Sequence, residues 1–168
     1  CLHSNNNNLY IYNMLINDPL IFYKEITSNE CILGIDPGTK RIGLAISDSS
    51  KKISSPLATL EKIKYTDMLG ELEKIKKQYL FGGIVIGNPI NMDGTIGKKA
   101  QSSNSLANNL VRDMKIPVLL WDERLSTSAV EKMLIDADIS RKRRKAIIDK
   151  LAATYILQGY LDYLVINL

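Results

Sequence analysis

Histidine, cysteine and long apolar runs are scarce in this chain, and each scarcity excludes a class of protein. The single histidine, His3, stands at the start of the sequence, which argues against histidine-rich zinc sites and a histidine base. The two cysteines cannot build a disulfide framework, and Cys31 lies inside a predicted buried strand. No apolar run approaches the roughly 18 to 20 residues of a membrane span. We therefore expect a cytoplasmic protein with no membrane partner.

The length of 168 residues is sufficient for one domain with a full hydrophobic core. Residues 1–30 differ from the remainder, because they begin with Cys and contain an asparagine tract. We expect residues 1–13 to be an extension outside the native protein, with Met14 the natural start, and residues 14–30 to form a short helix at the domain edge. Residues 31–168 are expected to form the domain itself.

The net charge of +4 is concentrated in one short segment. The run RKRRK carries five positive charges, which exceeds the net charge of the whole chain. It comprises Arg141, Lys142, Arg143, Arg144 and Lys145. Local basicity of this kind favours contact with an anionic polymer. The alternative is an ordinary solvated helix start.

The hydrophobic pattern after residue 30 predicts strands followed by alternating helices and strands. We expect strands at 31–36, 41–47, 52–60, 84–87 and 118–121, and helices at 66–80, 97–114 and 140–164. Gly82 and Gly83 are expected to end the first helix, and Ser128 with Glu131 to cap a further one. The predicted fold is α/β, a mixed five-stranded sheet flanked by helices.

Several carboxylates fall at predicted strand ends, where ligands of such sheets collect. Asp36 ends the apolar run ILGID and needs a metal ion, a hydrogen-bonding loop or a substrate as its partner. Asp122 and Glu123 end a later strand, and alternation allows only one of them to face the same side as Asp36. The other would pair with Arg124, a lysine or backbone donors, and a structural ion pair is the alternative for both.

Asp149 is a third candidate, on the edge of a small-residue face of the last helix that includes Ala152 and Ala153. It is either a surface residue or a carboxylate directed into the cleft. Three carboxylates would suit Mg²⁺ or Mn²⁺, and two such ions roughly 3.5 to 4 Å apart could hydrolyse a phosphodiester. The loop GNPINMDGTIGKK is either a phosphate site before a helix or a plain Asp-Gly turn and helix cap.

Four motifs in order, GIDPGTKRIGLAISD, IVIGNPINMDGT, LLWDERLST and SRKRRKAIIDKLAATYILQGYLD, resemble the YqgF/RuvX family over residues 31–164. This family comprises bacterial RNase H-like proteins related to Holliday junction resolvases. The resemblance implies an RNase H-like fold, a metal-dependent nuclease, and a role in maturing the 5′ end of 16S ribosomal RNA, with resolution of DNA junctions as the alternative. Catalytic metal ligands would be Asp36, Glu123 (or Asp122) and Asp149. Nucleic acid would be bound by Thr39, Lys40, Asn91, Thr95, Arg124, Arg141, Lys142, Arg143, Arg144 and Lys145.

Two other readings remain open at this point. The phrase IDPGTK also resembles the phosphate loop of actin-like and sugar-kinase ATPases, but these enclose their nucleotide between two such domains. A catalytically silent module could use the basic run to bind ribosomal RNA. We expect a monomer or homodimer whose partner is structured RNA, precursor ribosomal RNA above all, or branched DNA.

Overall fold

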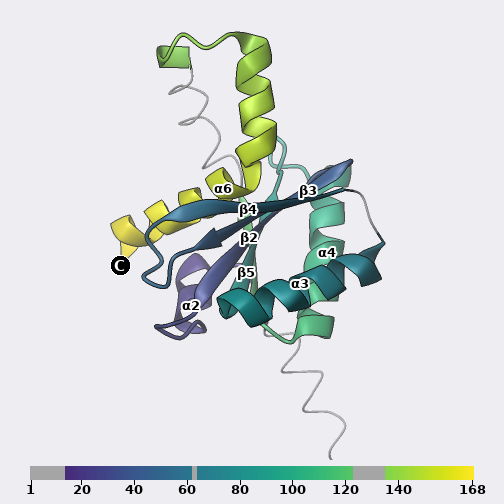
Figure 1. Ribbon diagram of the computed structural model, residues 1–168, viewed down its shortest axis with the longest axis vertical. Coiled ribbons are helices and arrows are strands. Elements are labelled where there is room, and N and C mark those ends of the chain that lie inside the picture. The colour runs from purple at the N-terminus through teal and green to yellow at the C-terminus, as the bar shows by residue number, and fades with distance from the viewer. Residues whose placement is uncertain (1–13, 62–63, 123–134) are drawn as a thin grey trace, which may run out of the picture.

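The computed structural model describes residues 14–61, 64–122 and 135–168, with the backbone alone at residues 145–150. A six-stranded sheet has the order β1-β6-β5-β2-β3-β4 (Figure 1). Its strands are β1 (Leu15–Ile16), β2 (Cys31–Pro37), β3 (Arg41–Ser47), β4 (Ser54–Glu61), β5 (Phe81–Asn88) and β6 (Val118–Asp122). The helices are α2 (Pro19–Lys24), α3 (Tyr65–Tyr79), α4 (Lys98–Met114) and α6 (Arg141–Asn167).

The sheet is mixed, as the sequence predicts. Strands β2, β3 and β4 form an antiparallel meander, whereas β5 lies parallel to β2, β6 parallel to β5 and β1 parallel to β6. The carboxyl ends of β2, β5 and β6 therefore meet at one edge of the sheet. That edge contains Asp36, Asn88 and Asp122.

The expected number of five strands is wrong by one, because β1 pairs with β6 as a sixth, outermost strand. Leu15 and Ile16 pair with β6, and the Val118 N–H donates to the Met14 carbonyl at 2.8 Å. The short helix α2 follows, and the Asp18 carboxylate accepts from two N–H groups of its first turn. A strand of two residues has no periodicity that a sequence could display, and for this reason it was not predicted.

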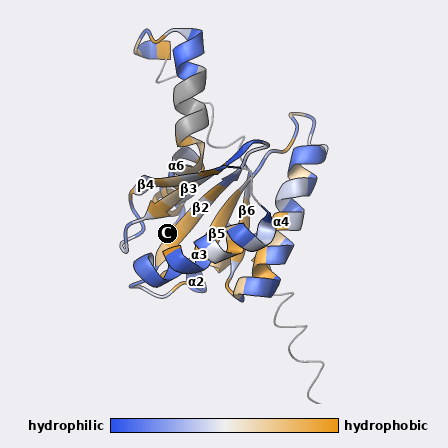
Figure 2. Cartoon of the chain, turned by 45° about the vertical axis from the view of Figure 1, so that its right-hand side comes forward, coloured by the Kyte–Doolittle hydropathy of each residue, from blue (hydrophilic) through white to orange (hydrophobic). Residues whose placement is uncertain are grey.

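Helices cover both faces of the sheet, so each central strand is buried on both sides. Ile32 and Leu33 are both fully buried, yet Ile32 packs towards α2 and α6 and Leu33 towards α3 and α4. The strands appear as apolar segments between more polar helices in Figure 2. Burial on two faces explains the nearly continuous apolar runs in the sequence.

The end of α3 corrects a second prediction. The helix ends at Tyr79, and Leu80 takes the left-handed conformation (φ 52°) while its N–H donates to the Lys76 carbonyl. Gly82 and Gly83 belong to β5 instead. A Cβ on Gly83 would lie 2.8 Å from both Phe22 and Ile26, so this glycine allows α2 and the segment after it to pack on the strand.

The other strands and helices predicted after residue 30 are present with end shifts of up to three residues, as in the extension of the 84–87 strand to Phe81–Asn88. The helix expected within residues 14–30 is limited to Pro19–Lys24, because the residues before it pair with β6. The capping box at Ser128 and Glu131 lies outside the described residues. Within the described ranges, no helix combines the length and the apolar character that a membrane span requires.

Candidate active site

Asp36 lies at the carboxyl end of β2, on the face of the sheet that α6 covers. Ile32 and Gly34, four and two positions earlier, face the same side, and a Cβ on Gly34 would lie 2.8 Å from Leu157 Cβ in α6. Asp36 is half-buried and pairs in register with Gly43 of β3. The strand therefore presents this carboxylate towards the helix, at the edge of the sheet.

Small residues form the contact between β3 and α6 beside Asp36. A Cβ added to Gly43 would lie 3.6 Å from Asp36 Cβ and 3.3 Å from Ala153 Cβ. Ala153 is itself buried. Glycine and alanine at this place let the helix approach the strand ends closely. A hard divalent cation, which takes carboxylate oxygens and keeps bound waters, fits such a position.

Strand alternation puts Asp122 on the opposite face of the sheet. Leu119 and Trp121 pack in the core beneath α6, whereas Val118 packs in the core beneath α3 and α4 with Leu120 against it. Asp122 shares the alternation of Val118 and Leu120 and pairs in register with Asn88. Glu123 and Arg124 lie outside the described residues. Asp36 and Asp122 thus occupy one edge of the sheet but different faces.

Position 149 belongs to the same continuous helix as the basic run, because α6 extends from Arg141 to Asn167. It precedes Ala153 by four residues, one helical turn, so the backbone places both on one helix face. The first part of α6 projects beyond the sheet (Figure 1). Side chains at residues 145–150, Asp149 and Lys145 among them, are outside the description.

Four members of the basic run have described side chains, and they are not equivalent. Arg141, Lys142 and Arg143 are exposed. Arg144 is half-buried, and its guanidinium donates to the Ile139 carbonyl at 2.6 Å. Arg144 therefore helps to fix the start of α6, where the Ser140 hydroxyl also accepts from the Arg143 N–H.

The turn between β2 and β3 and the loop between β5 and α4 contain the other predicted nucleic-acid ligands. Thr39 and Lys40 are exposed in the first. In the second, the Asn91 amide donates to the Thr95 hydroxyl (2.9 Å), which donates to Asp93 (2.6 Å). The hydroxyl and N–H of Thr95 lower the pKa of Asp93. Asn91 and Thr95 thus shape an Asp-Gly turn, with Gly94 at φ 83°.

Two features of the site were not anticipated from sequence. Asn88 Oδ1 is buried at the end of β5 without a hydrogen-bond partner within the described part of the chain. Trp121, one residue before Asp122, makes edge-to-face contacts with Tyr160 and Tyr163, each with centroids 5.6 Å apart. These rings join β6 to α6 close to the candidate site. The sequence around Trp121 could not predict these contacts, because both tyrosines lie about forty residues further along the chain.

Within the described ranges, no three acidic, cysteine or histidine side chains form a group that could hold a metal ion. Glu123 lies outside these ranges and the Asp149 side chain is not described, so the proposed ligand set rests on Asp36 and on strand and helix periodicity.

The strand order, the antiparallel meander and the packing of α6 across β2 and β3 define an RNase H-like domain. RuvC of T. thermophilus, solved in complex with a Holliday junction substrate, matches 82% of this chain and 96% of its own with a TM-score of 0.50 and 12% identity. At that identity the likeness shows the fold.

The sequence comparisons identify the family. The family profile described as "RuvX: Holliday junction resolvase" matches residues 30–163, and the chain belongs to this family. A "Putative pre-16S rRNA nuclease" of Cereibacter sphaeroides is 46% identical over 143 residues, covering 85% of this chain and 89% of that protein. The relative of the same name from Paramagnetospirillum magneticum is 45% identical over 144 residues, covering 86% and 93%. The resemblance stated from the motifs is confirmed.

Proposed function

We propose that the protein is a metal-dependent nuclease that hydrolyses phosphodiester bonds in the maturation of the 5′ end of precursor 16S ribosomal RNA, in the cytoplasm. The family and the names of its relatives support the reaction class and the substrate. The observation that carries the proposal is Asp36, a half-buried carboxylate at the end of a central strand, beside the close packing of Gly43 against Ala153 of α6.

Asp36, Glu123 and Asp149 would hold the metal. Glu123 is preferred to Asp122, because alternation assigns Asp122 to the face opposite Asp36. Asp149 lies one turn before Ala153, the residue that contacts the strand end beside Asp36. Mg²⁺ or Mn²⁺ bound there would activate a water molecule and stabilise the leaving oxygen. The carboxylates serve as its oxygen ligands and must be ionised to do so.

The cations around this edge would position the nucleic acid. Arg141, Lys142 and Arg143 are exposed on the projecting part of α6, and Thr39 and Lys40 are exposed beside Asp36. Contacts of this kind bind the phosphate backbone and carry no sequence information. Arg124 and Lys145 are expected to add to this surface. Arg144, Asn91 and Thr95, whose polar groups bond within the protein, would act through the shape of their segments.

A substrate panel tests the proposal. Wild type and Asp36→Asn are incubated with precursor 16S RNA, unrelated structured RNA and four-way DNA junctions, each with Mg²⁺ or Mn²⁺. We expect wild type to cleave precursor RNA near the mature 5′ end and Asp36→Asn to bind it without cleavage. Equal cleavage by both proteins would remove Asp36 from the reaction.

Resolution of DNA junctions is the second candidate, because the family is described as a Holliday junction resolvase. Symmetrical nicking of the DNA junction without cleavage of precursor RNA would select it. Binding of RNA without cleavage by wild type would instead indicate the silent binding module.

A further inference from the structure

Met92 is the most exposed of the large hydrophobic side chains in the described residues, with 93% of its surface accessible. It lies near the tip of the β5–α4 loop, and Ile96 in the same loop is 61% exposed. Neither exposed side chain contributes its apolar surface to the hydrophobic core. A single exposed apolar residue is ordinary. Met92 is distinguished by the turn that holds it and by the residues around it.

The loop holds Met92 on a closed turn. The Asn91 N–H donates to the Thr95 carbonyl (3.1 Å), and the Gly94 N–H donates back to the Asn91 carbonyl (2.8 Å). Asp93 Oδ1 accepts from both the N–H and the hydroxyl of Thr95. These bonds surround Met92 and fix the backbone on which it stands. Since the backbone is already ordered, a ligand that meets this side chain does not have to order the loop first.

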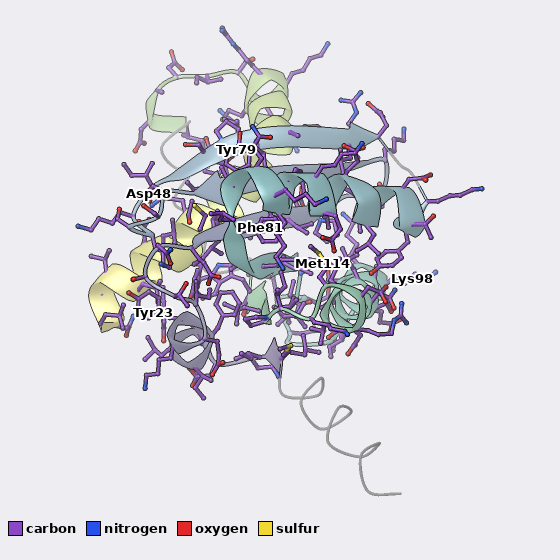
Figure 3. The ribbon with its side chains drawn as sticks, turned by 60° about the horizontal axis from the view of Figure 1, so that its bottom comes forward. Tyr23, Asp48, Tyr79, Phe81, Lys98 and Met114 are labelled. Carbon is purple, nitrogen blue, oxygen red and sulfur yellow. The ribbon has the colours of Figure 1, made fainter. Side chains whose placement is uncertain are left out.

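Two positive charges follow this apolar tip along the chain. Lys98 and Lys99, at the start of α4, are both exposed, and Figure 3 shows Lys98 on the side of the molecule opposite Asp48. The loop leaves β5 at the edge that contains Asp36. Figure 2 shows the loop and the first part of α6 projecting beyond this edge, apart from one another. An apolar tip with cations at the start of the next helix matches a nucleic acid, whose phosphates lie outside its apolar base faces.

We propose that Met92 is an apolar wedge that packs against a base face exposed where a substrate helix is interrupted, at a bulge, branch or helix end. The inference rests on the proposed binding of nucleic acid and adds a means of choosing the site. Apolar side chains, methionine included, enter base steps and unstack them. Unstacking costs least where the stack is already broken. The flexible, polarisable thioether can adapt to any base, so the wedge selects a structural feature without reading sequence.

Fluorescence of 2-aminopurine, which rises when the base unstacks, tests the wedge. The probe is placed beside a bulge in an RNA duplex, and a second duplex carries it without the bulge. Proteins are compared in the Asp36→Asn background, so that no cleavage is required. The parent should raise the fluorescence of the bulged RNA several-fold and leave the continuous duplex nearly unchanged.

Met92→Ala should abolish most of this rise and weaken binding of the bulged RNA about tenfold, the order expected for one lost base contact. Met92→Leu should retain both. Ile53→Ala is the matched control, since Ile53 is 64% exposed in the β3–β4 turn that contains Asp48, away from Lys98. It should match the parent in fluorescence and affinity.

An undiminished rise with Met92→Ala would overturn the wedge, and so would an equal loss of affinity for the bulged and continuous RNAs. Thermal unfolding verifies that each variant is folded. The nuclease proposal fails separately. If the protein unstacks the bulge through Met92 but its wild-type form never cleaves RNA, the wedge proposal is supported and the nuclease proposal is refuted. If the protein cleaves RNA without any Met92-dependent signal, the nuclease proposal is supported and the wedge proposal is refuted.

Discussion

Substitution of Gly43 by valine tests the close approach of α6 to the candidate site. A Cβ at this position would lie 3.3 Å from Ala153 Cβ and 3.6 Å from Asp36 Cβ, so the first added carbon already makes a tight contact with Ala153. Valine adds two further methyl groups to the same gap. Overpacking of a well-filled interior typically costs about 1 to 3 kcal/mol. We expect Gly43→Val to lose stability in this range and to lose cleavage, because its methyl groups cover the side of Asp36 that faces the helix.

Two measurements separate these effects. Urea denaturation gives the change in the free energy of unfolding, and binding of Mn²⁺ can be followed through Trp121, the only tryptophan of the chain. Gly34→Ala is the matched control. Its Cβ would lie 2.8 Å from Leu157 Cβ, so α6 must also shift, but the contact is two residues further from the strand end. The control should lose stability while retaining Mn²⁺ binding in the folded protein.

The account would be refuted by a Gly43→Val protein with wild-type stability and wild-type cleavage. Such a result would mean that α6 does not approach the strand ends as closely as the contacts of Gly43 indicate. If Gly43→Val loses stability but retains full activity at low temperature, the metal does not bind on the side of Asp36 that faces Gly43 and Ala153. The close packing of α6 on β3 would still be supported.

Three further predictions address the basic run, the last helix and the β3–β4 turn. Replacing Arg141, Lys142 and Arg143 by alanine should weaken binding to all nucleic acids and flatten its salt dependence by up to about three phosphate contacts' worth, measured by titration over a range of salt; an unchanged slope would return the run to a solvated helix start. Asp149→Asn should abolish cleavage while RNA affinity is kept or raised, and wild-type rates over a range of Mg²⁺ concentrations would remove Asp149 from the site. Asp48 has its pKa lowered from 3.8 to about 2, chiefly by hydrogen bonds from the Ile53 N–H and the Ser50 hydroxyl. A lowered pKa stabilises the fold above about pH 4, and this contribution is lost as the pH falls towards 2; urea denaturation should therefore show a deficit for Asp48→Asn at neutral pH that shrinks through this window, and a constant deficit would contradict the cause.

Local patterns were sufficient to predict most of the fold. Strands β2 and β5 are buried on both faces, so their apolar runs identified them, and Asp36 was conspicuous because a charge ends such a run. The hydrophobic pattern likewise located α3 and α4, in which Met68 and Leu110 are buried. Alternation further implied that Asp122 and the residue after it face opposite sides of the sheet.

The features that sequence did not reveal depend on contacts between distant segments. Gly83 appears to punctuate a helix in the sequence, but it is a glycine because Phe22 and Ile26 pack against it about sixty residues away. Strand β1 forms through its pairing with β6, a strand about one hundred residues away. The nearness of Gly43 to Ala153 is a contact over more than a hundred residues. In the sequence Arg144 is indistinguishable from the other cations of the basic run, but in the structure its guanidinium donates a hydrogen bond to the Ile139 carbonyl.

The most direct test of the central claim compares the two acidic residues at the end of β6. Cleavage of precursor 16S RNA is measured against Mn²⁺ concentration for Glu123→Gln, Asp122→Asn and Asp36→Asn, with folding verified by thermal unfolding. The account predicts that Glu123→Gln and Asp36→Asn lose cleavage at every Mn²⁺ concentration, whereas Asp122→Asn, altered on the opposite face of the sheet, continues to cleave. Cleavage that survives Glu123→Gln and disappears with Asp122→Asn would contradict the proposed site.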